Sequence, residues 1–380
     1  MILKPIGHTP ARTPVVVVYG GPSAEHDISI VSGTAIAEAL WQSGYPVEQR
    51  LVDLDGRWWT LPPNHRRRDR PAADYDDPVA LAAAGPTGAG EAADTLGRRD
   101  PKPVVFVALH GPYGEDGTVQ ALCEAADLPY TGAGVTASAI GMDKSTFKRL
   151  IRGLGLPVVD WREIRAARWE HDRDGVLGEL EAFAAGTGDP RLMIKPSRLG
   201  SSVGMTLAHD PDERGPALDL ALRYDDVALA ERYLAHARDL EVSVIGNEPD
   251  AIELFGPGEI LSGHEFYDFE AKYTPGLSET TTTAEVTPVQ RASILKLARD
   301  TYRAVGCEGF ARVDLLMAGD VLVVSEINTI PGFTPISLFP TMPSTGGYDF
   351  AAVCRRLIDL ALERHASRSR HRTRASDLYR

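Results

Sequence analysis

The sequence has few cysteines and no long apolar run, and both absences narrow the class of protein. Only Cys123, Cys307 and Cys354 occur among 380 residues. They are too few and too scattered for a disulfide framework or a zinc cluster, and their apolar surroundings favour buried thiols over nucleophiles. No stretch resembles a signal peptide or is long enough to cross a bilayer, so we expect a cytoplasmic protein without a membrane partner.

Positive charge is also scarce. The chain has 40 Lys and Arg against 53 Asp and Glu, a formal net charge of -13. This balance argues against nucleic acid as the main partner, because binding to nucleic acid depends on neutralising phosphates. An acidic protein that binds a smaller polyanion must instead gather a few basic side chains locally and recruit a metal ion. The length predicts two or three domains that share interfaces.

The apolar patterns differ between the two halves of the chain. The first half alternates strand-like and helical stretches, which predicts α/β units. Its strand candidates are residues 15–19, 104–109, 157–161 and 192–195, and its helical stretches are 28–41, 118–126, 137–154 and 176–185. After residue 227 strand candidates follow one another, which predicts antiparallel pairing in an α+β half. They are residues 227–233, 240–245, 251–255, 311–317 and 321–327, with helices near 289–305 and 348–364.

Two segments lack apolar periodicity. Residues 69–99 are rich in Ala, Gly, Pro and Asp, which predicts an irregular surface insertion. The end of the chain, from about residue 365, is basic and polar. It predicts a frayed terminus, with a nucleic-acid-binding arm as the alternative.

Residues 309–340 carry the strongest chemical signal. Two predicted strands flank a short turn, and side chains alternate along a strand, so Arg312 and Asp314 share one face, as do Glu326 and Asn328. Folding this hairpin puts Arg312 roughly opposite Glu326 and gathers two carboxylates, an amide oxygen and a guanidinium. Such oxygen ligands suit magnesium, with phosphate oxygens completing its shell. A solvated, salt-bridged face is the alternative.

A second candidate is a loop that follows a predicted strand ending at Lys195. Its sequence, PSRLGSSVGM, includes Ser201 and Ser202 and can present N–H and hydroxyl groups to phosphates, with Lys195 as a point charge. The lysine precedes the glycines, so this is not a Walker A loop. An ordinary surface turn is the alternative.

Two further candidates lie near the ends of predicted strands in the first domain. Glu25 follows a strand and a double glycine, and it is suited to hold a substrate ammonium group; capping of the next helix by Glu25 or Asp27 is the alternative. No GxGxxG fingerprint is present there. His110 falls at the carboxyl end of an apolar strand, where open α/β sheets bind ligands. The glycines around it indicate a functional loop, with a structural histidine as the alternative.

Taken in order, seven segments resemble the D-alanine–D-alanine ligases of the ATP-grasp superfamily. They are GGPSAEHDISIVS, ALHGPYGEDGTVQ, GMDKSTFKRLIRGLGLPV, IKPSRLGSSVGM, FYDFEAKY, GFARVDLL and SEINTIPGFTPISLFP. The resemblance covers about residues 15 to 364, apart from 69–99, and implies a three-domain ATP-grasp fold. An N-terminal parallel α/β domain is expected over 1–132, a central domain over 133–230 and a C-terminal domain over 231–380. ATP is expected between the antiparallel sheets of the last two.

The resemblance also implies how ATP and metal are held. The residues expected to contact ATP are Lys144, Lys195, Ser201, Ser202, Glu231, Leu234, Glu241 and Lys272. Of these, Glu231 and Leu234 are expected at the adenine, Glu241 at the ribose, and Lys272 at the γ-phosphate. Two magnesium ions, or manganese in their place, are expected on Asp314, Glu326 and Asn328.

The amino-acid sites follow from the same resemblance. Glu25 is expected to bind the ammonium group of the first D-alanine, with His110 nearby. Arg312 and the Gly332 N–H are expected to form the oxyanion site. Ser337 and the Leu338 N–H are expected to receive the carboxylate of the second D-alanine. Ser201, Tyr273 and Glu25 are expected to form a hydrogen-bonded group that closes a lid over residues 266–283.

These roles describe an ADP-forming ligase that activates one D-alanine as an acyl phosphate and joins it to a second, for peptidoglycan synthesis. A homodimer is expected. One alternative is a paralogous ligase with D-serine or another acceptor, in a resistance or biosynthetic pathway. Another is a nucleotide-binding regulator without catalysis. One departure bears on the acceptor: after EAKY the family usually has a Pro-Ala pair, whereas this chain has four consecutive threonines, Thr280 to Thr283.

Overall fold

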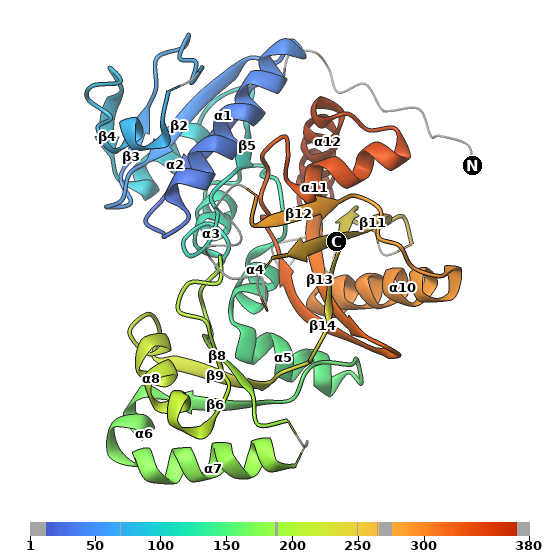
Figure 1. Cartoon of the computed structure of the whole chain (residues 1–380). Coiled ribbons are helices and arrows are strands. Elements are labelled where there is room, and N and C mark those ends of the chain that lie inside the picture. Colours follow the sequence, from blue (N-terminus) through green and yellow to red (C-terminus); the bar gives the residue numbers. More distant parts are fainter. Residues whose placement is uncertain are drawn as a thin grey trace, which may run out of the picture.

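The first domain is built on a five-stranded sheet. The computed structural model describes residues 13–68, 70–186, 189–248, 250–263, 265 and 276–370. In the first sheet the strand order is β4-β3-β2-β1-β5, with β1 parallel to β2 and β5. The strands are β1 (Val15–Gly20), β2 (Val47–Val52), β3 (Trp58–Thr60), β4 (Ala84–Thr87) and β5 (Val104–Val107). The helices of this region are α1 (His26–Gln42), α2 (Ala89–Gly97) and α3 (Thr118–Ala125). The parallel α/β arrangement expected here is confirmed for β2, β1 and β5, whereas the edge strands β3 and β4 pair antiparallel (Figure 1).

The expectation of an irregular insertion over 69–99 is wrong. The described part of this segment adds the edge strand β4, the helix α2 and a short helix η1 (Ala72–Asp76) to the first domain. Tyr75 is fully buried, with its ring 6.3 Å from that of Tyr19, and Leu96 is 1% exposed. Small alanines make most of the buried face of α2, so the segment lacks the large apolar residues from which periodicity is recognised.

The central domain has a four-stranded antiparallel sheet in the order β6-β9-β7-β8. The strands are β6 (Trp161–Arg165), β7 (Leu192–Pro196), β8 (Thr206–Ala208) and β9 (Val227–Arg232). The helices are α4 (Val135–Met142), α5 (Lys144–Gly153), α6 (Ala166–His171), α7 (Arg173–Ala185) and α8 (Pro211–Ala221). The strand predicted within 227–233 therefore belongs to this sheet and not to the sheet of the second half.

Two predictions for this domain need correction. The helix predicted over 137–154 is two helices, because Asp143 leaves the helical conformation and its side chain accepts the Thr146 N–H at 2.8 Å, capping α5. The strand predicted over 157–161 begins only at Trp161. Before it, Val158 makes an isolated bridge to Val324 instead of joining the central sheet.

The C-terminal sheet has five strands in the order β12-β11-β10-β13-β14, all antiparallel. The strands are β10 (Arg238–Ile245), β11 (Glu253–Ser262), β12 (Ser278–Thr281), β13 (Phe310–Ala318) and β14 (Val321–Asn328). The helices are α10 (Pro288–Val305), α11 (Leu338–Thr341), η2 (Met342–Gly346) and α12 (Phe350–Arg368). The predicted α+β half is confirmed. Strand β11 runs beyond the predicted 251–255 through a Gly-Pro pair, which forms a bulge opposite β10.

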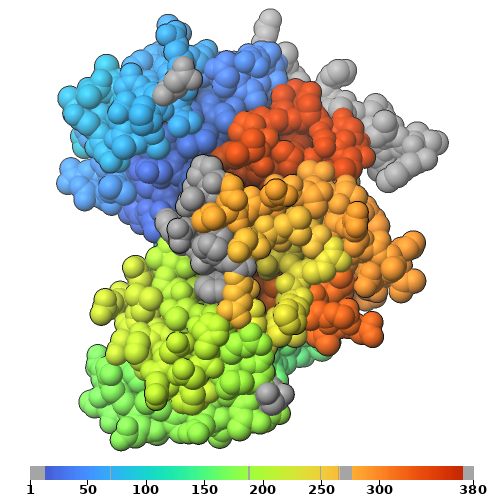
Figure 2. Space-filling model, in the orientation of Figure 1, coloured from blue at the N-terminus to red at the C-terminus, as the bar shows by residue number. Residues whose placement is uncertain are grey.

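The first and third domains share one apolar core. A single buried cluster contains Val17 and Phe106 of the first sheet together with Phe310 and Ile358 of the third domain. Helix α12 packs against α1 in this core (Figure 1). The sheet of the central domain and its helices α6 to α8 have a separate core, formed within residues 164–221 and 228–230, whereas α4 and α5 pack into the core of the C-terminal domain. Figure 2 shows the central domain as a distinct green mass beneath the blue and orange parts of the molecule.

The expectation of a frayed, basic end from about residue 365 is wrong for its described part. Helix α12 continues to Arg368, which pairs with Glu124 and Glu308. His365 Nε2 lies 2.9 Å from Asp127 Oδ1. These basic side chains hold the last helix against the first domain. None of the helices in the described part of the chain has the length and apolar character needed to span a membrane.

Candidate active site

A cavity lies between the central sheet and the C-terminal sheet. Its lining includes seven of the eight residues predicted to contact ATP: Lys144, Lys195, Ser201, Ser202, Glu231, Leu234 and Glu241. The eighth, Lys272, and the lid residue Tyr273 lie outside the described residues. Arg312, Asp314 and Glu326 line the same cavity. Residues from four separate stretches of sequence are thus brought to one space.

The hairpin of β13 and β14 brings the side chains predicted to bind metal together, but its two strands pair in a different register from the one expected. Asp314 pairs with Glu326 and Arg312 with Asn328, so the expectation that Arg312 lies opposite Glu326 is wrong by two residues. An irregularity after Asp314, which the sequence pattern does not reveal, accounts for one of these residues, and the turn, which pairs Ala318 with Val321, accounts for the other. Glu241 on β10 pairs with Asp314 from the other side. Three acidic residues therefore form a row across three strands.

Basic side chains neutralise this acidic row. The Arg312 guanidinium lies 2.7 Å from Asp314 Oδ2 and 3.3 Å from Glu241 Oε1. Lys144 Nζ lies 3.1 Å from Glu326 Oε2. Burial alone would lower the pKa of Arg312 and of Lys144, but the facing carboxylates outweigh it and raise both pKa values. Both groups are therefore cationic at neutral pH.

The donor set fits magnesium that is completed by phosphate. Within the described residues, no three His, Cys, Asp or Glu side chains converge as a metal cage. Asp314 and Glu326 supply two carboxylates on adjacent strands, and Asn328 lies beside them, with its Nδ2 2.8 Å from Asp314 Oδ2. Magnesium is usually held by one or two carboxylates with substrate phosphates and water. An open set of this kind is what a metal–nucleotide complex requires.

Glu25 joins the first domain to the loop of the central domain. Ser201 Oγ donates to Glu25 Oε1 at 2.5 Å, across 176 residues of sequence. Glu25 stands at the start of α1 but its side chain makes no capping hydrogen bond, so the capping alternative is wrong for this residue. A Cβ on Gly200 would lie 2.6 Å from Glu25 Oε2, and one on Gly111 would lie 2.5 Å from the same atom. A side chain at either position would displace the end of the Glu25 side chain.

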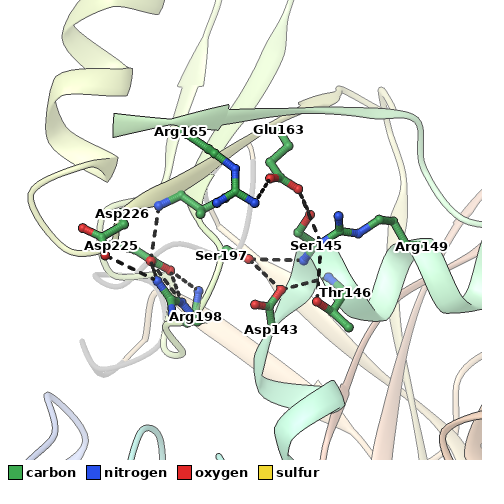
Figure 3. Close-up of polar contacts among 11 residues, drawn as sticks. Asp143, Ser145, Thr146, Arg149, Glu163, Arg165, Ser197, Arg198, Asp225 and Asp226 are labelled. Carbon is green, nitrogen blue, oxygen red and sulfur yellow. Dashed lines mark hydrogen bonds and ion pairs between the residues drawn. The ribbon is translucent and has the colours of Figure 1, made fainter. Parts of the chain in front are cut away.

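The base of the serine-containing loop is fixed by polar contacts (Figure 3). Ser197 O accepts the Lys144 N–H at 3.0 Å, and Ser197 Oγ lies 3.2 Å from Asp143 Oδ1. The next residue, Arg198, donates its N–H to the buried Asp225 at 2.7 Å and also pairs with it through its guanidinium. The loop and the start of α5, which carries Lys144, are therefore held as one unit.

His110 is buried and uses both ring nitrogens. Nδ1 lies 2.8 Å from Ile330 O, and Nε2 lies 2.8 Å from Ser32 Oγ. Burial lowers the pKa of His110, so the ring is neutral at pH 7. This geometry fits the structural alternative: His110 positions the loop that follows Asn328. A direct contact between His110 and substrate stays a prediction.

The loop after β14 brings the predicted oxyanion and carboxylate groups close together. Ser337 Oγ lies 2.7 Å from Thr334 Oγ1, and a Cβ on Gly332 would lie 3.3 Å from Ser337 Oγ. Leu338 follows at the start of α11. The ring of Phe333 anchors the loop in the shared core, 5.9 Å from the ring of Phe106. Gly332, Ser337 and Leu338 thus lie on one anchored loop, as the resemblance implies.

Sequence reasoning missed Glu115, which ties two loops of the site together. Its Oε1 accepts the Gly111 N–H at 2.9 Å, and its Oε2 accepts the Ile330 N–H at 3.0 Å. Burial, and then the charge of Glu25, raise the pKa of Glu115 to about 8. The sequence motif GEDG contains Glu115 and was the signal available. Nothing in the sequence indicates a partner 215 residues away.

Sequence reasoning also missed Lys148, one helical turn after Lys144. Lys148 Nζ and Lys195 Nζ each lie 3.0 Å from the same atom, Glu231 Oε1. The signal available was the spacing of four residues, which places Lys144 and Lys148 on one face of a helix.

Comparisons with known proteins agree with this arrangement. A family model described as D-ala D-ala ligase N-terminus matches residues 14–133, and one described as D-ala D-ala ligase C-terminus matches residues 150–359. The D-alanine–D-alanine ligase of Kineococcus radiotolerans is 40% identical over 374 residues, covering 92% of this chain and 96% of the relative. That of Streptomyces griseus is 38% identical, covering 93% and 94%.

Two solved structures extend the comparison. The D-alanine–D-alanine ligase from Coxiella burnetii superposes with a TM-score of 0.76 at 31% identity, covering 94% of this chain and 96% of that one. The VanG D-Ala:D-Ser ligase from Enterococcus faecalis superposes with a TM-score of 0.78 at 26% identity, covering 92% and 99%.

Proposed function

The chain belongs to the D-alanine–D-alanine ligase family and has its ATP-grasp fold, and from that premise we propose that it joins two D-alanine molecules through an acyl phosphate at the expense of ATP. The observation that carries the proposal is the cavity lined by seven predicted ATP contacts together with Arg312, Asp314 and Glu326. The product is a precursor for peptidoglycan synthesis. A cytoplasmic location and a homodimeric state belong to the proposal.

The first step activates a carboxylate. Lys144, Lys195 and the loop with Ser201 and Ser202 hold the phosphates, while Glu231, Leu234 and Glu241 hold the nucleoside. Lys272, on the lid, completes the contact with the γ-phosphate. Asp314, Glu326 and Asn328 would hold two magnesium ions, or manganese in their place. When bound, these ions neutralise the charge that moves with the phosphoryl group.

The second step forms the peptide bond. Glu25 holds the ammonium group of the first D-alanine, and Ser337 with the Leu338 N–H holds the carboxylate of the second. The amine of the second attacks the carbonyl carbon of the acyl phosphate, and Arg312 with the Gly332 N–H stabilises the oxyanion. Collapse of this intermediate breaks the C–O bond and releases inorganic phosphate, and the attacking amine loses a proton. Losing one such donor typically raises the barrier by about 3 kcal/mol. Ser201 and Tyr273 close the lid, which keeps water from the acyl phosphate.

A second candidate acceptor is D-serine, and it is favoured by the likeness to the VanG D-Ala:D-Ser ligase. The run of threonines gives it little support. Thr280 and Thr281 belong to the edge strand β12, and Thr281 Oγ1 accepts the N–H of Thr283 at 3.3 Å. None of the four threonines lines the described cavity. D-alanine therefore remains the leading acceptor.

Product analysis tests the proposal. The purified protein is incubated with ATP, magnesium and a mixture of D-alanine, D-serine, D-lactate and L-alanine, and the products are identified by mass spectrometry at neutral and alkaline pH. We expect D-alanyl-D-alanine as the main product, no product from L-alanine and little ester with D-lactate. A dominant D-Ala–D-Ser product selects the second candidate. Equal rates with both enantiomers of alanine contradict both candidates.

A further inference from the structure

Lys148 is a buried cation that no step of the reaction uses. Its side chain is 0% exposed, and it projects from α5 toward Glu231. It does not line the cavity, whereas Lys195 and Glu231 do. Lys148 thus lies behind Glu231 as seen from the cavity. A buried ammonium is costly unless a partner compensates it, so its presence calls for a role.

Glu231 is the partner that Lys148 compensates. The side chain of Glu231 is 6% exposed, and Oε1 faces both lysines at 3.0 Å. The contact with Lys148 is an ion pair and not an aligned hydrogen bond. Burial alone would raise the pKa of Glu231, but the two lysines outweigh it and lower that pKa. The carboxylate is therefore ionised while it is shielded from water.

The two lysines differ in what they are free to do. Lys195 faces the cavity, and under the proposed function it also contacts the phosphates of ATP. Lys148 does not line the cavity, and the carboxylate it pairs with is that of Glu231. The ring of Trp161 lies 5.8 Å from Lys148 Nζ and helps to enclose it. When Lys195 contacts the phosphates of ATP, Lys148 is the cation that still keeps Glu231 ionised and in place.

We infer that Lys148 is a positioning residue that sets the purine specificity of the nucleotide site by keeping Glu231 an ionised acceptor. This inference rests on the proposed function, which puts adenine beside Glu231. An ionised carboxylate only accepts hydrogen bonds, so it pairs with the 6-amino group of adenine. A 6-oxo purine presents an acceptor there and is repelled. Without Lys148, the buried carboxyl group takes up a proton more readily and becomes able to donate to that oxygen.

Nucleotide selectivity is the test, with ATP and inosine triphosphate as probes, because their bases differ at position 6 and the adjoining N1. Initial rates are measured with saturating D-alanine for the unaltered enzyme and for Lys148→Met. We expect the KM for ATP to rise about tenfold and the ATP-to-inosine-triphosphate ratio of kcat/KM to fall about tenfold, which corresponds to the loss of one hydrogen bond to a charged group. The kcat with ATP is expected to change less than about threefold.

Two further variants separate this role from a loss of stability. Lys148→Arg keeps the charge and is expected to restore most of the ratio. Arg214→Met removes another buried cation of the central domain, which donates to Pro190 O at 3.0 Å and does not contact Glu231. It is expected to lower stability and leave the ratio unchanged. If Lys148→Met does not fold, Lys148→Gln replaces it. The ATP-to-inosine-triphosphate ratio of kcat/KM does not depend on the amount of active protein.

The outcomes are distinct. A ratio in Lys148→Met or Lys148→Gln equal to that of the unaltered enzyme overturns the inference. A double variant of Lys148→Met with Glu231→Gln should be no less selective than Glu231→Gln alone, because both changes act on one contact; additive losses also overturn it. If the unaltered protein forms no dipeptide, the proposed function fails. Calorimetric binding of the two nucleotides then still decides the role of Lys148.

Discussion

The C-terminal domain meets its two neighbours in different ways. Against the first domain it buries a continuous apolar cluster that includes Phe106, Phe310 and Ile358. Against the central sheet it presents a polar cavity, where Lys144 pairs with Glu326, whereas helices α4 and α5 of the central domain pack into the apolar core of the C-terminal domain. Apolar burial stabilises a permanent interface, whereas charged groups around a cavity keep it open to polar ligands. The comparison indicates one composite body, formed by the first domain, the C-terminal domain and helices α4 and α5, which the central sheet faces across the cavity.

Buried polar groups also differ between the two interfaces. Arg364, at the apolar interface, donates to the backbone carbonyls of Tyr130 and Gly132, and its partners belong to the scaffold. At the cavity, Arg312 and Lys144 pair with side chains that the nucleotide and metal are proposed to engage. Changes at the first interface should therefore cost stability, and changes at the second should cost activity.

The largest effect is expected at the cavity. Glu326→Gln removes a carboxylate from the proposed magnesium site and should lower kcat by about 1000-fold or more, about 4 kcal/mol of barrier, with the thermal midpoint nearly unchanged. Asp320→Asn, at the exposed turn of the same hairpin, is the matched control and should be fully active. Near-normal turnover in Glu326→Gln would contradict the metal assignment.

The next effect is expected at the apolar interface. Arg364→Met leaves two buried carbonyls without their donor and should lower the free energy of unfolding by about 3 kcal/mol, with kcat of the folded enzyme retained. Urea unfolding measures it. Arg356→Met, on the same helix with a partly exposed side chain, should cost under about 1 kcal/mol. Equal losses in both variants would show that the buried contacts do not hold the two domains together.

A smaller loss is expected from Glu115→Gln. The amide NH2 must face one of the two N–H groups that Glu115 accepts, which should cost about 2 kcal/mol. In the unaltered protein the pKa of Glu115 rises from 4.5 to about 8 on folding, so the unfolded chain loses this proton first. Its contribution to stability is therefore full below pH 4.5 and is lost as pH rises toward 8.

Urea unfolding at pH 5 and pH 8 checks this sign. The variant lacks the titrating group, so the difference in stability between the two proteins should be larger at pH 5 than at pH 8. The same difference at both values would mean that Glu115 is ionised in the folded protein.

The smallest effect is expected at the rim of the apolar interface. Asp127 is largely exposed and pairs with His365 of α12 and with Lys102. Asp127→Asn should lower the free energy of unfolding by less than about 1 kcal/mol, because exposed ion pairs are screened. Added salt should reduce the difference further. A loss of stability as large as that of Arg364→Met would show that the exposed rim contributes as much to this interface as its buried contacts do.

The sequence predicted the features that depend on neighbouring residues. The valine-rich strand β1, the helix after it and the hairpin with Asp314 and Glu326 all follow from local patterns of apolar and polar residues. The family resemblance then predicted eight contacts to ATP, and the seven of them that lie among the described residues line one cavity. Local order and motif order were thus sufficient for the architecture and for the residues that line the cavity.

The features that escaped prediction depend on distant partners or on small side chains. Glu115 and Lys148 look like ordinary polar residues of a loop and a helix until Ile330 and Glu231 are placed beside them. Helix α2 was missed because alanines supply much of its buried face. The shift between Arg312 and Glu326 arises in part from one irregular residue pairing, which alternation alone does not reveal.

The packing of α12 against the first domain has a consequence for biosynthesis. The contact between Arg364 and Tyr130 joins residues 234 positions apart, and the apolar cluster begun by β1 is completed only by this last helix. During translation the first domain therefore leaves the ribosome with one apolar face uncovered until nearly the whole chain has been made. Such exposed surfaces recruit chaperones or aggregate. The central domain, whose core lies within about seventy consecutive residues, is free to fold on the ribosome before the domain that precedes it is finished.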